Sequence, residues 1–103
     1  MAAIPDSVKE SLERFLALVR QERQVEAAYL YGSQVKGVAT EWSDIDVTVV
    51  SSDFADLFEE RLVLMRLAAQ VDDRIEPHPF RPQDFNANAP LVNEIRRTGV
   101  RVA

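Results

Sequence analysis

The chain has 103 residues, so we expect one small domain covering residues 1–103. Twelve basic and seventeen acidic residues give a net charge of −5, which disfavours tight binding to a nucleic-acid backbone. There is no cysteine, which excludes disulfides, thiolate zinc sites and thiol catalysis, and no apolar run approaches the length of a membrane span, so we expect a cytoplasmic protein without membrane segments.

The N-terminal third predicts a helix followed by a strand. Pro5 and Asp6 are typical of a helix start, and we expect this helix to end near Arg23 or Gln24. Its apolar residues recur with helical spacing: Val8, Leu12, Phe15, Leu16 and Val19. The short apolar segment 25–31 then predicts the first strand, which stops at Gly32, and residues 33–39 predict a turn and a short helix.

The middle of the chain predicts a second strand and a longer helix. Residues 46–50 are rich in β-branched side chains and form the predicted strand, with Asp44 at its entrance. Asp53 is expected to cap a helix that runs to about Gln70. We expect its buried positions to include four apolar residues: Leu57, Leu62, Met65 and Ala69.

The last third predicts a strand, a helix and a short terminal strand. Residues 74–80 form the predicted strand, and because Pro77 and Pro79 cannot donate to a ladder, at least one side of it should be free. Pro90 is expected to start the last helix and Gly99 to end it, with a strand at 100–102. The order αβαβαβα predicts an α/β or α+β domain built on one small sheet.

The segment from Gly32 to Asp46 holds the strongest candidate site. A Gly32–Ser33 turn can hold a phosphate through backbone N–H groups and the hydroxyl, and Asp44 and Asp46 would project together from a strand and could share divalent metal ions. Either element alone is more often a plain turn or a solvated strand end. Together, at the same edge of a sheet, they predict metal-assisted phosphoryl or nucleotidyl transfer.

Two-metal transfer usually needs a third carboxylate, for which we select Glu76. It lies within a predicted strand, where Ile75 would face the core and Glu76 the site. The other candidates are better explained as turn or cap residues: Asp72, Asp73 and Asp84.

Several further residues are candidates for accessory roles. His78 should share the face of Glu76 and could contact phosphate, act as a base or orient Glu76, or be only a half-exposed strand residue. Ser43 is placed among the phosphate-binding residues, and Lys36 and Arg81 could contact phosphate or be plain surface charges. Trp42 could shield or stack on a base, or could pack.

The pattern Gly32-Ser33, ten residues, Asp44-x-Asp46 and a later acid resembles the nucleotidyltransferase superfamily that includes DNA polymerase β, and more closely its minimal nucleotidyltransferase (MNT) proteins. The resemblance implies a polymerase β-like fold, a small mixed sheet with helices packed mainly on one side. It also implies ATP or another nucleoside triphosphate as donor and two Mg²⁺ ions held by Asp44, Asp46 and Glu76. Glu76 departs from the Asp that is common in the superfamily, and it is followed by Pro77.

The resemblance also implies a partner. Minimal members are often paired with a helical HEPN toxin, which the MNT antitoxin can adenylylate. We therefore expect transfer of AMP from ATP to a hydroxyl of a HEPN-type partner. Assembly of the chain into a homo-oligomer is a further option that the sequence does not exclude. The alternatives are a catalytically silent antitoxin that acts by direct contact, and transfer to a small molecule or an RNA end.

Overall fold

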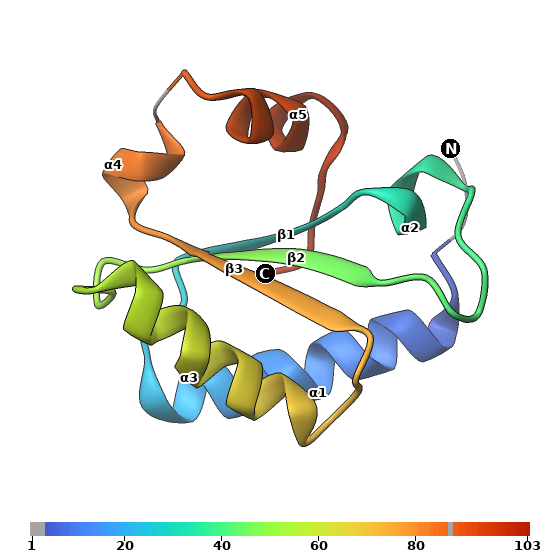
Figure 1. Ribbon diagram of the computed structural model, residues 1–103, viewed down its shortest axis with the longest axis horizontal. Coiled ribbons are helices and arrows are strands. Elements are labelled where there is room, and N and C mark those ends of the chain that lie inside the picture. Colours follow the sequence, from blue (N-terminus) through green and yellow to red (C-terminus); the bar gives the residue numbers. More distant parts are fainter. Residues whose placement is uncertain (1–3, 87) are drawn as a thin grey trace.

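The computed structural model describes residues 4–86 and 88–103. Figure 1 shows a central sheet with helices on both sides. In chain order the elements are α1 (Asp6–Glu22), β1 (Ala27–Tyr31), α2 (Ser33–Lys36), β2 (Ile45–Val50), α3 (Leu57–Ala69), β3 (Ile75–Phe80), α4 (Pro82–Phe85), α5 (Pro90–Thr98) and β4 (Val100–Arg101). The predicted α/β class is confirmed, and no helix within the described ranges is long and apolar enough to cross a membrane.

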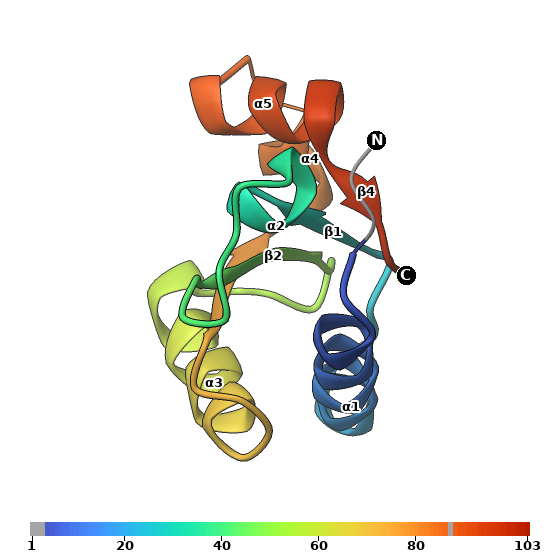
Figure 2. The same cartoon turned by 90° about the vertical axis from the view of Figure 1, so that its right-hand side faces the viewer.

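The four strands form one mixed sheet in the order β3-β2-β1-β4. Strand β1 runs antiparallel to β2 and β4, whereas β2 and β3 are parallel. The long helices α1 and α3 lie side by side on one face, as the expected one-sided packing requires, and α4 and α5 lie over the opposite face (Figure 2). Helix α4 is missing from the sequence prediction, although Pro82 at its first turn and Asp84, whose carboxylate accepts the Arg81 N–H, mark its start.

The core lies between the sheet and the two long helices. Strand residues alternate, so that Leu30, Ile45, Val47 and Val49 are fully buried against this layer. Helix α1 contributes the residues that its spacing predicts: Val8, Leu12, Phe15, Leu16 and Val19. The other side chains of the central strands therefore project to the opposite face, which carries the candidate site.

Strand β3 is an edge strand whose free side is closed to further pairing. Ile45 N–H donates to the Arg74 carbonyl at 2.7 Å and Ser51 N–H to the Phe80 carbonyl at 3.0 Å. In this parallel register the even-numbered residues of β3 exchange hydrogen bonds with β2, so Pro77 and Pro79 face the free edge. Proline has no N–H to offer there, which protects the edge from strand addition.

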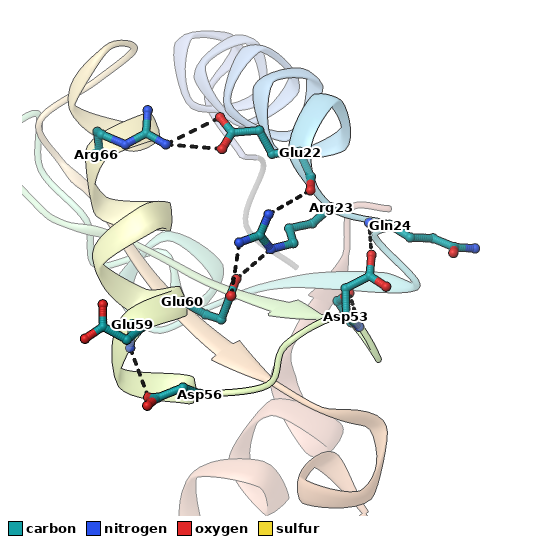
Figure 3. A network of polar contacts seen from close by, with 9 residues as sticks. Glu22, Arg23, Gln24, Asp53, Asp56, Glu59, Glu60 and Arg66 are labelled. Carbon is teal, nitrogen blue, oxygen red and sulfur yellow. Dashed lines mark hydrogen bonds and ion pairs between the residues drawn. The ribbon is translucent and has the colours of Figure 1, made fainter.

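Helix α3 starts later than the sequence predicts. Its cap is Asp56, whose carboxylate accepts the N–H groups of Phe58 and Glu59, and not Asp53. The Asp53 carboxylate instead accepts the Gln24 N–H at 2.7 Å and ties the segment after β2 to the end of α1 (Figure 3). Both residues have suitable chemistry for a cap, and only the path of the chain after β2 decides between them.

The predicted inner face of α3 is also wrong. Leu62 is 48% exposed and Met65 43% exposed, Ala69 is exposed, and Leu57 is only half-buried. The residues that α3 buries are Glu60, Leu64, Leu67 and Ala68. Buried Glu60 is accommodated because Arg23 donates two hydrogen bonds to its carboxylate, at 2.7 and 3.0 Å (Figure 3). Helix α3 is thus apolar on two faces, of which the sheet covers one.

We expect Asp56→Ala to lower the free energy of unfolding by about 1 kcal/mol, because two N–H groups of the first turn lose their acceptor. Urea denaturation followed by circular dichroism measures the change. Asp53→Ala is the matched control, since it removes one exposed contact and no helix cap. An equal or larger loss for Asp53→Ala would contradict the assignment of the cap.

Candidate active site

The candidate site is built on the sheet face opposite the core. Tyr31 of β1 pairs with Asp46 of β2, and Asp46 pairs with Glu76 of β3, so the three residues form one row across the sheet. The next row places Thr48 beside His78. Asp46 and Glu76 are 30 residues apart in the chain, and the parallel pairing of β2 with β3 brings them to neighbouring positions.

The two aspartates of the motif differ in their surroundings. Asp44 is exposed and precedes β2, whereas Asp46 lies within the strand and is partly buried. Burial raises the pKa of Asp46, and the charges of Asp44 and Glu76 raise it further, with His78 opposing. The carboxylates therefore repel one another through this site, and a bound cation would relieve that repulsion.

Gly32 brings the Gly32–Ser33 turn close to Asp46. It joins β1 to α2 with φ 78° and ψ −148°, a conformation that essentially only glycine adopts. A Cβ at this position would lie 2.5 Å from the Asp46 Oδ2 atom. The backbone at Gly32–Ser33 and the Asp46 carboxylate thus share one small space, which is the juxtaposition that the motif predicts.

The connection from α2 to β2 fixes Asp44. Gln34 is buried, and its Nε2 donates to the Asp44 carbonyl at 3.3 Å. The Ser43 hydroxyl accepts the Thr40 N–H at 2.8 Å and is used within the loop, so the structure gives Ser43 a role in shaping the turn. Sequence reasoning missed Gln34, whose only signal is a polar residue directly after the Gly-Ser pair.

His78 lies on the predicted face, on β3 two residues after Glu76. Its ring packs against Tyr31 with centroids 6.2 Å apart. Burial lowers the pKa of His78, and Arg61 lowers it further, so the imidazole is neutral at pH 7. Burial and the charge of Asp46 raise the pKa of the Tyr31 phenol to about 12, which keeps it protonated.

The remaining accessory candidates lie elsewhere or have other contacts. Lys36 forms an ion pair with Glu94 of α5 at 2.8 Å, and Arg81 pairs with Asp84 at 2.7 Å. Trp42 is 83% exposed and does not pack against the core.

The alternatives to Glu76 have other contacts or lie in a turn. Asp72 accepts hydrogen bonds from Ser11 of α1 and from Arg74, whose guanidinium holds the pKa of this carboxyl well below its usual range. Asp84 pairs with Arg81 at the start of α4, and Asp73 is an exposed turn residue. Glu76 alone among these four stands in register with Asp46.

The donor set fits a divalent cation. Asp44, Asp46 and Glu76 supply the oxygen ligands that Mg²⁺ prefers, and burial together with the charges of the other two carboxylates raises the pKa of Asp46. As the side chains stand, no three acidic or histidine groups in the described ranges are close enough to enclose an ion. Glu76 instead lies 3.9 Å from Arg61 of α3.

Substitutions of Glu76 and of Asp72 test which of these two carboxylates is the metal ligand. We expect Glu76→Gln to weaken Mg²⁺-dependent nucleotide binding by at least about tenfold, because the amide is a poorer metal ligand than the carboxylate. The free energy of unfolding should stay the same, because Glu76 is a partly exposed residue of the edge strand β3. Calorimetry with ATP and Mg²⁺ measures the binding.

Asp72→Asn should have the opposite profile. We expect a loss of about 1–3 kcal/mol in unfolding free energy at pH 7, because Asp72 accepts charge-assisted hydrogen bonds from Arg74, and we expect normal nucleotide binding. Because the pKa of Asp72 is lower in the folded chain than in the unfolded chain, its carboxylate stabilises the fold at pH values above the unfolded-state pKa. This stabilisation is lost as the pH falls through the folded-state pKa. Urea denaturation of the wild type and of Asp72→Asn between about pH 7 and pH 2 should therefore show that the difference in their unfolding free energies becomes smaller in acid. Reversed profiles for the two variants would make Asp72 the ligand.

The structure is a small α/β domain with a mixed sheet, in which a glycine turn lies close to a strand carboxylate and a second acid stands in register on the neighbouring strand. A family model described as polymerase beta, nucleotidyltransferase matches residues 13–103. The chain therefore belongs to the polymerase beta nucleotidyltransferase family, as its motif predicts.

Solved structures support the fold. One toxin–antitoxin complex with AMP-PNP contains a chain that is 20% identical, with a TM-score of 0.66 over 92% of this chain and 72% of the other. A complex of a tri-AMPylated Shewanella oneidensis HEPN toxin with an MNT antitoxin gives 20% identity and a TM-score of 0.64 over 93% and 71%. A mutant MntA complex in which two aspartates, spaced two residues apart, are replaced by glutamate gives 20% identity and a TM-score of 0.67 over 92% and 72%. No curated protein matches the chain.

Proposed function

We propose that the chain transfers AMP from ATP to a hydroxyl of a HEPN-type partner protein, acts as its antitoxin and does so in the cytoplasm. The observation that carries the transfer is the contact between Gly32 and Asp46, with Glu76 in register beside them. Membership in the nucleotidyltransferase family supports the reaction class. The similar folds seen in complexes with AMP-PNP and with an AMPylated HEPN toxin support the donor and the acceptor.

In this proposal each residue has one task. The backbone at Gly32 and Ser33 holds the β- and γ-phosphates, since glycine lets the chain approach them closely. Asp44, Asp46 and Glu76 would hold two Mg²⁺ ions, which when bound would neutralise the phosphates and lower the pKa of the acceptor hydroxyl. Gln34 keeps Asp44 in place through its carbonyl.

The reaction is a substitution at the α-phosphorus. The acceptor oxygen forms a bond to that phosphorus, the bond to the oxygen that bridges to the β-phosphate breaks, and pyrophosphate leaves while the hydroxyl proton is released. Helices α4 and α5 cover part of this sheet face, but the exposed position of Asp44 just before β2 leaves that end of the site accessible to another protein. This accessibility suits a macromolecular acceptor better than a small one.

The test is transfer of label from α-labelled ATP. The purified chain with Mg²⁺ and a lysate of the source cells should label one protein, and the Asp44→Asn variant in the same lysate should label none. Label on RNA or on a small molecule would contradict the protein acceptor. No label, together with no calorimetric binding of ATP and Mg²⁺, would favour a catalytically silent antitoxin that acts by contact.

A further inference from the structure

Helix α3 exposes a continuous apolar surface along its whole length. Phe58 is 71% exposed, and Leu62, Met65 and Ala69 follow it on the same side of the helix, at spacings of three and four residues. We call these four residues the outer face of α3. A helix that is apolar on two faces is typical of an element buried from both sides, and here the sheet and α1 cover only the inner one.

The outer face borders the candidate site. Figure 2 shows α3 at the margin of the helical layer, with α1 on its one flank and no other described element on the opposite flank. Met65 and Ala69 line a cavity of about 170 Å³ together with Ile75 and Glu76 of β3. Arg61, one residue before Leu62, extends from the same helix to within 3.9 Å of the Glu76 carboxylate. A protein bound to this face would therefore reach Glu76.

The chemistry around the face indicates which partner it fits. Asp56, Glu59 and Asp73 are exposed near its two ends and form no ion pair among the described residues, whereas the two arginines beside the face are both paired, Arg66 with Glu22 and Arg61 with Glu76. The border is therefore acidic, which matches the negative charge of the chain and favours a basic partner.

The neighbouring edge strand excludes one mode of binding. Pro77 and Pro79 present no N–H groups at the free side of β3, so a partner cannot add a strand there. Contact must go through side chains, as it does when a helix packs across another helix.

We propose that the outer face of α3 docks a helix of the acceptor protein, one whose apolar stripe is flanked by lysine and arginine, and that this docking presents the acceptor hydroxyl to the edge of the sheet at Glu76. The identity of the docked protein as the acceptor rests on the proposed nucleotidyl transfer. The docking surface itself rests on the exposed outer face, the cavity that reaches Glu76, the acidic border and the closed strand edge.

Two synthetic helical peptides test the surface. Both carry the same leucine stripe at spacings of three and four residues, one with flanking lysines and the other with flanking glutamates. In ¹⁵N spectra of the labelled chain we expect the lysine peptide to shift the amides of residues 57–69 and of Glu76. We expect it to bind at least about tenfold more tightly than the glutamate peptide, because the border is acidic.

A double variant and a matched control locate the binding. Leu62→Glu with Met65→Glu should abolish the shifts, whereas Ala17→Glu, which changes an exposed apolar residue of α1, should preserve them. The dispersion of the spectra verifies that both variants are folded. Calorimetry with ATP and Mg²⁺ on the same samples should give the same nucleotide affinity for all three proteins.

Shifts confined to other elements, or equal affinity for the two peptides, would overturn the proposal. A wild-type chain that sediments as a dimer, and that the double variant converts to a monomer, would assign the face to a second copy and also overturn it. Absence of nucleotide binding in the wild-type chain would instead count against the transfer reaction, and the peptide result would still decide whether the outer face is a docking surface.

Discussion

Asp46→Asn is expected to abolish nucleotidyl transfer and leave a protein that is at least as stable as the wild type at pH 7. The loss of activity should be at least about 10³-fold, because a metal-binding carboxylate at the reacting centre stabilises the transition state by several kcal/mol. Label transfer from ATP measures the activity, and urea denaturation measures the stability. Full activity in the variant would reject the site.

The sign of the stability change follows from the direction of the pKa shift. Burial and the neighbouring carboxylates raise the pKa of Asp46 in the folded chain, so the folded state binds more protons than the unfolded state. In the absence of Mg²⁺ the free energy of unfolding of the wild type therefore falls as the pH rises through that pKa. The asparagine of Asp46→Asn carries no charge that the neighbouring carboxylates could repel, so this decrease is absent from the variant. A variant that is less stable than the wild type at pH 7 would show that Asp46 supports the fold.

Added Mg²⁺ and ATP provide a second readout of the same variant. A ligand that binds only the folded state raises the free energy of unfolding by RT ln(1 + L/Kd), where L is the free ligand concentration. The melting temperature of the wild type should rise with Mg²⁺ and ATP, and that of Asp46→Asn should stay unchanged. Asp44→Asn should behave in the same way as Asp46→Asn in this assay, even though Asp44 is the more exposed of the two.

Features specified by neighbouring residues could be predicted from the sequence. The spacing of apolar residues placed α1 and its buried face, and Gly32 at the end of an apolar strand predicted a glycine turn, which the structure shows close to Asp46. The two proline positions in β3 predicted a strand with a free side, which the edge position confirms. In each case the determining interactions lie within a few residues along the chain.

Features that depend on distant contacts could not be predicted in the same way. Asp53 and Asp56 are equivalent as caps by chemistry, and the contact of Asp53 with Gln24, 29 residues away, removes it from that role. The faces of α3 are both apolar, so periodicity could not identify the inner one, and buried Glu60 depends on Arg23 of the preceding segment. The placement of Glu76 on a strand was predicted, but its register with Asp46 exists only once the parallel pair has formed.

Gly32→Ala is expected to damage both the fold and the site, because two independent constraints meet at this residue. Its φ of 78° with ψ of −148° is a conformation that costs a side-chain-bearing residue about 1–3 kcal/mol. The added Cβ would also lie 2.5 Å from the Asp46 Oδ2 atom, so the carboxylate must move out of its place. We expect a loss of about 2–3 kcal/mol in unfolding free energy and loss of detectable ATP binding, measured by urea denaturation and calorimetry.

Gly37→Ala separates the two constraints. Gly37 ends α2 with φ 76° and ψ 17°, an ordinary left-handed conformation, so alanine there should cost about 1–2 kcal/mol. Because Gly37 lies at the far end of α2 from the Gly32–Ser33 turn, we expect ATP binding to survive in this variant. If Gly37→Ala and Gly32→Ala lost nucleotide binding equally, general destabilisation would explain both. Binding lost only at Gly32 would show that the turn must approach Asp46 without a side chain for the nucleotide to be held.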